Sequence, residues 1–364
     1  MIQGHGGNIY ALARALGCPP DTIIDMSSNI NPIGAPPGLL DHLRNHLECI
    51  GVLPEVDASA AVQNMAGILG VDPQCMLAGC GTTQFIYTVC PALKVKKALI
   101  VGPTYADYAD ACHMYGVQPH HFLAIADQGF KADAALLDQA CEGVDTVFIC
   151  NPNNPTGRLI HQAELDTLCR NHPETRFIID ESYLPFAPAE VSRSMTGCGL
   201  DNVAVLWSLS KIFGLPGVRA GFLIANESVL SRFRRLMQPW SLNALAQAAV
   251  DYLGTHRKQI RAFIDETQRY LQDERQEFSE AIASLPLLVS YPSQSSFLLL
   301  GLPPGLKAHT VCRRMAERRI LIRNCHNFHG LSDGYIRVAL KDRATNRIAL
   351  ERLMEVVDQA ATAD

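Results

Sequence analysis

The chain lacks long apolar runs and basic stretches, and each absence excludes a class of protein. Nothing approaches the roughly 18 consecutive apolar residues of a membrane-spanning helix, so we expect no membrane partner. Residues 1–8 are polar and glycine-rich, without the charged and apolar regions of a signal peptide, so we expect a cytoplasmic protein. Basic residues never run beyond pairs such as Arg234-Arg235, and the net charge is −5. These features argue against nucleic acid as a partner.

Metal and disulfide signatures are missing as well. The 12 cysteines are scattered, and no two have the C-x-x-C spacing of many zinc and redox sites. Several lie in apolar runs, as Cys150 does, which is typical of reduced and buried thiols. His42 and His46 are four apart on an expected helix, but no third ligand accompanies them. We therefore predict no metal site.

The residues that are present predict an α/β protein. With 364 residues, 48% of them apolar, the chain can form one large domain and a smaller one. Apolar runs of strand length alternate with helical patterns, which favours a mostly parallel sheet covered by helices on both faces. The expected strands are 98–101, 146–150, 177–179, 203–207 and 221–225, and the expected helices include 82–92, 105–115 and 161–171.

The pattern changes after about residue 239. One long helical stretch is expected over 244–284, followed by short strands and a final helix over 346–360. This order predicts a smaller α+β domain. We assign 42–243 to the large domain, and 1–41 with 244–364 to the small domain, which includes an N-terminal substrate-binding segment. The short strands are expected at 287–290, 297–300, 320–322 and 336–340.

Lys211 is the first residue to suggest chemistry. It lies among Ser208, Ser210 and the later Arg219, just after an expected strand. A lysine amine can form an imine with an aldehyde cofactor, and hydroxyls with a guanidinium suit a phosphate monoester. Alone, this motif also fits an exposed loop lysine.

Two further motifs follow expected strands. Asp180, with Tyr183 three residues later, follows the strand 177–179, where a carboxylate can pair with a protonated pyridine nitrogen. The string 151–157, Asn-Pro-Asn-Asn-Pro-Thr-Gly, follows the strand 146–150, and its prolines and glycine predict a rigid turn. We expect this turn to hold Asn154 against the oxygen of a cofactor ring.

A glycine-bearing segment opens the expected helix 82–92. Gly81, Thr82 and Thr83 would let backbone N–H groups approach an anion at a helix N-terminus, although a glycine pair alone is weak evidence. Downstream, Tyr105 offers an aromatic face for a heteroaromatic ring, though taken by itself this tyrosine is better explained by core filling.

In this order, the four segments resemble the aspartate aminotransferase superfamily, fold type I of the pyridoxal 5'-phosphate enzymes, over essentially the whole chain. The resemblance implies that Lys211 holds the cofactor, that Asp180 pairs with its ring nitrogen, and that Asn154 and Tyr183 bind its phenolic oxygen. It also implies a homodimer with active sites at the subunit interface. The residues implied for the cofactor phosphate are Gly81, Thr82, Thr83, Ser208, Ser210 and Arg219.

Two arginines near the C-terminus are the expected substrate anchors. Arg337 lies where the superfamily carries its arginine for the α-carboxylate, and Arg323 matches the arginine that binds a substrate phosphate in the histidinol-phosphate aminotransferase branch. The N-terminal segments around His5 and Asn29 resemble the decarboxylase branch that acts on O-phospho-L-threonine in cobalamin synthesis. We therefore expect His5, Asn29 and Asn154 to contribute to binding a small phosphorylated amino acid.

The same sequence features also fit other functions. A histidinol-phosphate aminotransferase would use the same cofactor and a similar phosphate anchor, and an O-phosphoserine decarboxylase would fit nearly as well. A regulator built on this fold would need residues for a DNA-binding domain, and the chain has none to spare. The superfamily's usual Tyr-Pro-Asp stretch reads Leu53-Pro54-Glu55 here, so the tyrosine contact to the partner subunit's cofactor is expected to be lost or replaced.

Overall fold

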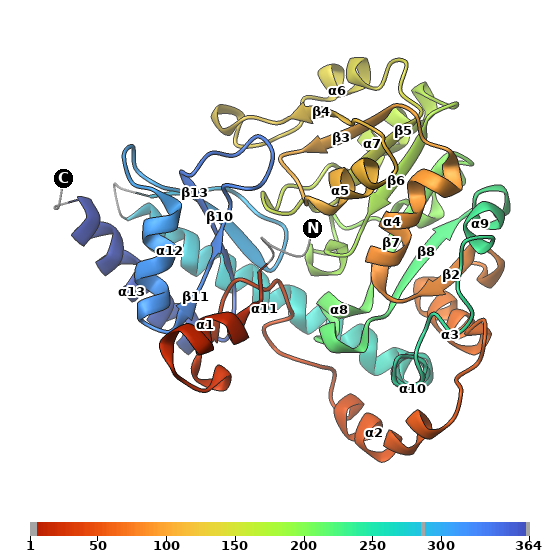
Figure 1. Ribbon diagram of the computed structural model, residues 1–364, viewed down its shortest axis with the longest axis horizontal. Coiled ribbons are helices and arrows are strands. Elements are labelled where there is room, and N and C mark those ends of the chain that lie inside the picture. The colour runs from red at the N-terminus through yellow and green to blue at the C-terminus, as the bar shows by residue number, and fades with distance from the viewer. Residues whose placement is uncertain (1–5, 285–287, 362–364) are drawn as a thin grey trace.

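The computed structural model describes residues 6–284 and 288–361 (Figure 1). Its largest element is a seven-stranded sheet in the order β2-β8-β7-β6-β5-β3-β4. The strands are β2 (Met76–Gly79), β3 (Ala98–Gly102), β4 (His120–Leu123), β5 (Thr146–Cys150), β6 (Arg176–Asp180), β7 (Val203–Ser208) and β8 (Gly221–Ala225). Strands β4, β3, β5, β6 and β7 run parallel, and β8 is antiparallel to both of its neighbours.

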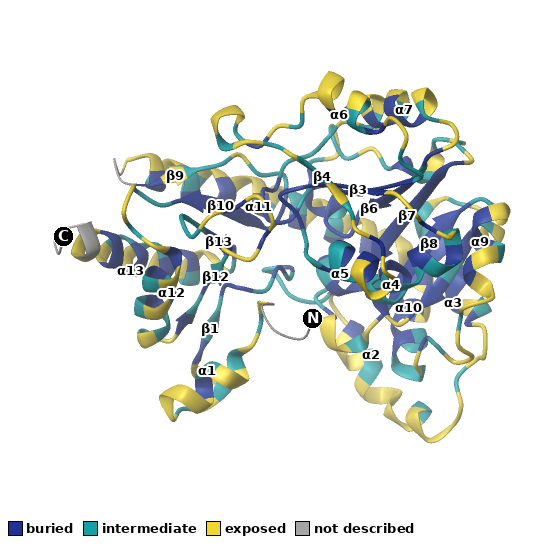
Figure 2. Cartoon of the chain, turned by 45° about the horizontal axis from the view of Figure 1, so that its top comes forward, coloured by how far each residue is buried: buried dark blue, intermediate teal, exposed yellow. Residues whose placement is uncertain are grey.

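Helices cover both faces of this sheet, as expected for strands whose side chains are buried on both sides (Figure 2). The helix α4 packs against β7 and β8 and contacts α5 and α9, while α6 packs against α7. The helices of the first part of the chain are α1 (Ile9–Leu16), α2 (Leu39–Asn45), α3 (Ser59–Leu69), α4 (Gly81–Leu93), α5 (Asp107–Met114), α6 (Ala134–Ala140), α7 (Gln162–Asn171), α8 (Leu209–Ile212), α9 (Glu227–Arg234) and α10 (Ala244–Thr255).

A smaller antiparallel sheet stands at the other end of the molecule, in the order β12-β13-β10-β9 (Figure 1). A separate parallel pair joins β1 to β11. The strands are β1 (Ile24–Asp25), β9 (Val289–Ser290), β10 (Phe297–Gly301), β11 (Ile320–Leu321), β12 (Arg323–Asn324) and β13 (Tyr335–Ala339), and the helices are α11 (Arg257–Ala283), α12 (Ala308–Glu317) and α13 (Arg343–Ala361). The first strand of the chain thus completes the C-terminal part of the fold.

The structure confirms all five strands expected in the large sheet, within one residue at each end. It adds β2 and β4, which the apolar pattern did not predict. The single helix expected over 244–284 is wrong: α10 and α11 are separate helices that meet at His256. Gly254 and Thr255 are weak helix formers at the end of α10, which favours a break there.

Two details of the C-terminal strands also differ from expectation. The strand expected over 320–322 is β11, which ends at Leu321 and pairs with β1, and the separate strand β12, which pairs with β13, was not expected. The first residue of the expected strand 287–290 lies outside the described residues, and β9 covers only its last two. The division of the chain at residue 243 stays a prediction, and α10 on its C-terminal side packs against α2 and α3.

The parallel strands place the expected site loops on one edge. The loops after β3, β5, β6 and β7 all leave the carboxyl ends of parallel neighbours, where open α/β sheets bind their ligands. In the part of the chain that the structure describes, no helix is both long and apolar enough to cross a membrane.

Candidate active site

A cavity of about 100 Å³ lies at the carboxyl edge of the large sheet. Every residue predicted to bind the cofactor lines it, although these residues come from five separate segments. They are Gly81, Thr82, Thr83, Tyr105, Asn154, Asp180, Tyr183, Ser208, Ser210, Lys211 and Arg219. The sequence motifs therefore converge on one site.

Asp180 ends β6 at the floor of this cavity and is almost fully buried. Its Oδ2 accepts a hydrogen bond from the Tyr108 hydroxyl at 2.8 Å, and its Oδ1 accepts the Ser182 N–H at 3.0 Å. Burial, reinforced by the charge of Asp180, raises the pKa of Tyr108, so this phenol stays a donor. The carboxylate is thereby oriented by two donors before any ligand arrives.

The end of the cavity beside Arg219 is shaped by two glycines. A Cβ on Gly81 would come within 2.8 Å of the Arg219 guanidinium, and a Cβ on Gly221 within 2.4 Å of the Thr82 backbone nitrogen. The absence of side chains lets the first turn of α4 and Arg219 approach each other closely. Backbone N–H groups, hydroxyls and a guanidinium together form a donor set for a phosphate monoester.

The loop 151–157 is held by its own asparagines. Asn151 exchanges two side-chain hydrogen bonds with the backbone of Ile160, at 2.9 and 2.8 Å. The Asn153 amide donates to the Pro103 carbonyl at 2.8 Å, which ties this loop to the one after β3. Asn154 is thereby fixed in the wall of the cavity.

A second cavity, of about 150 Å³, lies between the two sheets. Lys211, Tyr105, Asn154 and Tyr183 line both cavities, so the lysine stands at the boundary between them. The Lys211 Nζ lies 5.6 Å from the centre of the Tyr183 ring. The remaining lining residues of the second cavity are Gly6, Ser27, Ser28, Asn29, Ala106, Arg323, Asn327, Phe328 and Arg337.

Arg323 and Arg337 stand directly opposite each other on the antiparallel strands β12 and β13. Within the described residues neither guanidinium has a carboxylate partner. Burial lowers the pKa of Arg323, and the positive charge of Arg337 lowers it further. Two like charges in directly opposite positions destabilise a sheet unless an anion lies between them, so the pair predicts an anion-binding site.

Each arginine is held in place by neutral groups. The Arg323 Nη2 donates to the Asn327 Oδ1 at 2.6 Å, and its guanidinium lies 5.1 Å from the centre of the Phe328 ring. The buried Arg337 donates from Nη1 to the Asn154 Oδ1 and from Nη2 to the Ser27 carbonyl at 2.5 Å. Its Nε has no partner among the described residues.

Asn29 lies buried beside these arginines. Its amide donates to the Tyr183 hydroxyl at 3.2 Å, and its Oδ1 has no partner in the described part of the chain. Of the predicted substrate residues, Asn29, Asn154, Arg323 and Arg337 therefore share one cavity. His5 lies outside the described residues.

Sequence reasoning missed several residues of the site. Tyr108 orients Asp180 from 72 positions away, and its only sequence signal is that it lies one helical turn after Tyr105. Asn327 and Phe328 hold Arg323 from the following loop. These residues act on other side chains, so no motif for ligand chemistry could have found them.

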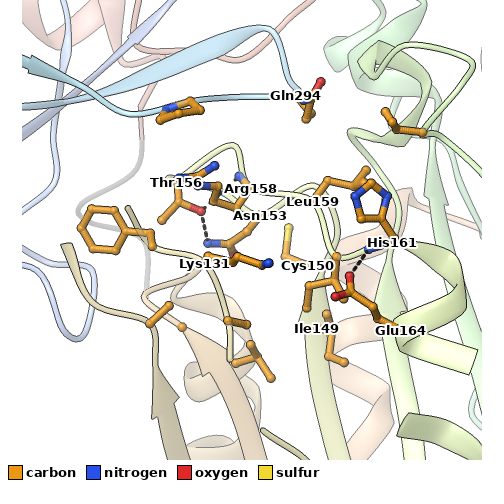
Figure 3. Close-up of a pocket in the computed structure, with 18 residues that line it drawn as sticks. Lys131, Ile149, Cys150, Asn153, Thr156, Arg158, Leu159, His161, Glu164 and Gln294 are labelled. Atoms are coloured by element: carbon orange, nitrogen blue, oxygen red, sulfur yellow. Dashed lines mark hydrogen bonds between the residues drawn. The ribbon is translucent and has the colours of Figure 1, made fainter. Parts of the chain in front are cut away.

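A third cavity, of about 220 Å³, lies behind the loop 151–157 (Figure 3). Lys131, Arg158 and Glu164 line it, and the Arg158 Nε donates to the Gly129 carbonyl at 2.5 Å. The Glu164 carboxylate accepts the His161 N–H at 3.0 Å. None of the predicted site residues lines this cavity.

The donors of the first cavity fit pyridoxal 5'-phosphate. A close approach of glycine backbone and Arg219 suits its phosphate, an oriented carboxylate suits its ring nitrogen, and Lys211 reaches both cavities.

His42 and His46 stack on each other, with their ring centres 3.9 Å apart. In the described ranges, no three His, Cys, Asp or Glu side chains are placed to hold a metal ion.

Comparisons with known proteins agree with this geometry. A model of the aminotransferase class I and II family matches residues 3–353. Threonine-phosphate decarboxylase from Salmonella typhimurium is 35% identical, over 100% of this chain and 99% of the relative. Histidinol-phosphate aminotransferase from Methanocaldococcus jannaschii is 27% identical, over 90% of this chain and 88% of the relative. The crystal structure of L-threonine-O-3-phosphate decarboxylase from Porphyromonas gingivalis has a TM-score of 0.82 and 32% identity, and the match covers 92% of this chain and 100% of that one.

Proposed function

The chain belongs to the aminotransferase class I and II family, and we propose that it is a pyridoxal 5'-phosphate enzyme that decarboxylates O-phospho-L-threonine. The product would be (R)-1-amino-2-propanol O-2-phosphate, a precursor of cobalamin. The observation that carries this proposal is the pair Arg323 and Arg337, which face each other in a cavity that reaches Lys211 and have no carboxylate partner among the described residues. The 35% identical relative, a threonine-phosphate decarboxylase, supports the same reaction.

The cofactor would occupy the first cavity. Arg219, the hydroxyls of Ser208 and Ser210, and the start of α4 would hold its phosphate. Asp180 would pair with its ring nitrogen, while Asn154 and Tyr183 would bind its phenolic oxygen. When bound there, pyridoxal phosphate supplies an electron sink for the electron pair left at Cα when the carboxylate departs.

The substrate would occupy the second cavity, with one anionic group at each arginine. Arg323 would take the phosphate, because Asn327 and Phe328 keep its guanidinium fork oriented. Arg337 would orient the carboxylate together with Asn154, with which it already shares a hydrogen bond. Asn29 would contribute its unpartnered Oδ1 and its amide, and we propose the same binding role for His5.

The reaction replaces the carboxylate on Cα by a proton. Lys211 stands between the two cavities, so its amine is the group placed to deliver that proton. Tyr108 keeps the Asp180 carboxylate oriented and so would keep its charge available to the ring nitrogen. The orientation of the substrate between Arg323 and Arg337 decides which bond at Cα breaks.

Release of carbon dioxide tests the reaction directly. We expect the purified, cofactor-loaded protein to release carbon dioxide from O-phospho-L-threonine without any keto acid. O-phospho-L-serine, which lacks only the methyl group, is the comparison that ranks substrates.

The second candidate is histidinol-phosphate aminotransferase, which the 27% identical relative supports. That enzyme would share Lys211 and Arg323 in the same roles. No release of carbon dioxide, together with amino transfer from histidinol phosphate to 2-oxoglutarate, would establish this alternative and reject decarboxylation.

We also propose that the protein is a cytoplasmic homodimer. The segment 50–56 exposes Ile50, Val52, Leu53 and Val56, and Leu53 is 74% exposed. Contiguous exposed apolar side chains of this kind mark protein interfaces. Sedimentation of the wild type should give a dimer, and Leu53→Asp should shift it toward monomer. A wild type that sediments as a monomer would overturn the proposal, and cell fractionation tests the location.

A further inference from the structure

Asp25 ends β1, and the chain around it is bonded to the segments just before Arg323 and just after Arg337, the two proposed substrate arginines. Asp25 is the register partner of Leu321, two residues before Arg323. The next residue, Met26, donates its N–H to the Leu321 carbonyl at 2.8 Å. The Met26 carbonyl accepts the N–H of Ala339, two residues after Arg337, also at 2.8 Å. The turn that begins at Asp25 is therefore fixed to both arginine-bearing segments.

The Asp25 carboxylate binds the turn itself. Its Oδ1 accepts the Ser27 N–H at 2.9 Å, the Ser27 hydroxyl at 2.7 Å and the Ser28 N–H at 3.3 Å. Its Oδ2 accepts the Ser28 hydroxyl. Four donors on two residues are thus held by one charged group. Hydrogen bonds to a charged acceptor are about twice as strong as neutral ones.

Ser27 connects the Asp25 carboxylate to the second cavity, called the substrate cavity from here on, through two hydrogen bonds. Its carbonyl accepts the Arg337 Nη2 at 2.5 Å, and its hydroxyl accepts the Gly7 N–H at 2.7 Å. Gly6 and Ser27 touch so closely that a Cβ on Gly6 would come within 2.4 Å of the Ser27 carbonyl oxygen. Gly6, Ser27 and Arg337 all line the substrate cavity.

The negative charge of Asp25 acts on two nearby cations, in addition to the hydrogen bonds that its carboxylate accepts. Burial lowers the pKa of Arg337, whereas the negative charge of Asp25 acts in the opposite direction. Lys341 experiences the same pair of effects, burial first and Asp25 against it. Asp25, together with Asp342 in the case of Lys341, is therefore an acid whose charge offsets the burial of these two cations, and among the described residues it forms no ion pair with Arg337.

We propose that Asp25 is a positioning residue for the substrate. It does not line the cavity, and it acts through the Ser27 carbonyl on Arg337 and through the Ser27 hydroxyl on the segment at Gly6 and Gly7. The proposal rests on the proposed function, because it assigns Arg337 to the substrate. Without the Asp25 carboxylate, the Ser27 carbonyl is no longer held in place as the acceptor for the Arg337 guanidinium, and the substrate cavity loses its preformed shape.

The test compares Asp25→Asn with Asp21→Asn in the cofactor-loaded enzyme. Asparagine keeps the size of the side chain but cannot accept all four hydrogen bonds, so we expect KM for O-phospho-L-threonine to rise by about 10- to 100-fold. The value of kcat should stay within about threefold, and the visible absorbance of the bound cofactor should be unchanged. Asp21 is exposed on the short helix just before β1, so its variant should match the wild type.

A double variant separates positioning from general structural damage. If Asp25 acts through Arg337, Asp25→Asn should have little further effect on KM in an Arg337→Gln background. Fully additive effects on KM would overturn the proposal. An unchanged KM in Asp25→Asn, or a loss of kcat with KM unchanged, would overturn it as well.

A binding measurement keeps the proposal independent of the reaction. Phosphoglycolate, which carries a phosphate and a carboxylate but no amine, should raise the melting temperature of the cofactor-loaded wild type by mass action, and should do so less in Asp25→Asn. If the wild type fails to release carbon dioxide, the proposed function fails, but this comparison still tests Asp25. Equal stabilisation of both cofactor-loaded proteins by phosphoglycolate would reject the positioning role.

Discussion

Lys211 is the residue on which the cofactor assignment depends, because among the described residues that line both cavities it is the one with an amine that can form an imine with an aldehyde cofactor. We predict that Lys211→Ala loses the visible absorbance band of lysine-linked pyridoxal phosphate and lowers turnover by at least about a thousandfold. Absorbance spectra and carbon dioxide release measure the two effects. A variant with full activity would reject Lys211 as the proton donor and cofactor anchor.

A substitution at Arg323 should show whether phosphate binding depends on positive charge alone or also on the planar shape of the guanidinium. Arg323→Lys keeps the positive charge but loses the planar fork that donates to Asn327 and packs on Phe328. We therefore predict that KM for O-phospho-L-threonine rises by about 10- to 100-fold while kcat changes little. Arg313→Lys, on the exposed face of α12, is the control in steady-state kinetics. An unchanged KM would mean that the phosphate binds elsewhere.

The sequence could predict the residues with distinctive chemistry that line the cavities, but not the residues that hold those side chains in place. Lys211, Asp180 and Asn154 follow strands and carry distinctive chemistry, so their convergence on one cavity follows from the parallel order of the strands. Tyr108 and Asp25 were not predicted as part of the site. They act through hydrogen bonds to other protein groups, and such pairings depend on the folded chain.

At the scale of elements, the loop 151–157 carries the strictest steric requirement. Gly157 has φ +70°, and a Cβ there would lie 2.1 Å from the Ser293 Oγ and 2.9 Å from the Ser293 Cα. Gly157 also accepts the Gln294 N–H at 2.8 Å, which joins this loop to the segment before β10. The loop that positions Asn154 thus depends on a residue without a side chain.

We predict that Gly157→Ala destabilises the fold by about 2–4 kcal/mol, which combines backbone strain with the clash at Ser293. Gly143→Ala is a matched control, because Gly143 has φ +71° and no atom within 4 Å of its would-be Cβ. That variant should lose only the backbone part, about 1 kcal/mol. Urea unfolding measures both. Equal losses would show that the loop accommodates a methyl group.

The strands differ in how strongly their own local sequence predicts them. The inner strands of the large sheet read as continuous apolar runs, because both of their faces are buried, and they were predicted to within a residue. Edge strand β4 contains His120 and His121 and lacks that signal. Strands β1 and β12 are two residues long and form through pairing with distant partners, which no local pattern encodes, whereas the apolar run at 320–322 did predict β11.

At the scale of the whole molecule, the substrate cavity depends on how the two sheets face each other. The loop that follows Arg323 contacts edge strand β4 of the large sheet. The His329 and His121 rings lie 4.0 Å apart, and a Cβ on Gly330 would touch the Leu123 side chain. The loop that holds the proposed phosphate anchor therefore rests on the large sheet through a pair of histidines.

This contact predicts a pH dependence of stability. Burial and the charges of His329, His113 and His120 lower the pKa of His121 from 6.5 to about 4. Among the described residues, the side chains that contribute to this shift are these three histidines, and their positive charges oppose protonation of His121. The folded protein binds fewer protons than the unfolded chain between pH 6.5 and pH 4, and stability falls as pH decreases through that window.

His121→Asn should remove this loss of folding stability on acidification. Because His121 is only partly buried, we discount the shift for solvent screening and expect about 1 kcal/mol between pH 7 and pH 4.5. The measurement is the urea-unfolding free energy of the wild type and the variant at both pH values. His329→Asn should give a smaller effect of the same sign, because it removes one repelling neighbour and leaves the burial of His121. If both variants lose as much stability as the wild type on acidification, His121 is not the group that titrates and the two sheets are held together by other contacts.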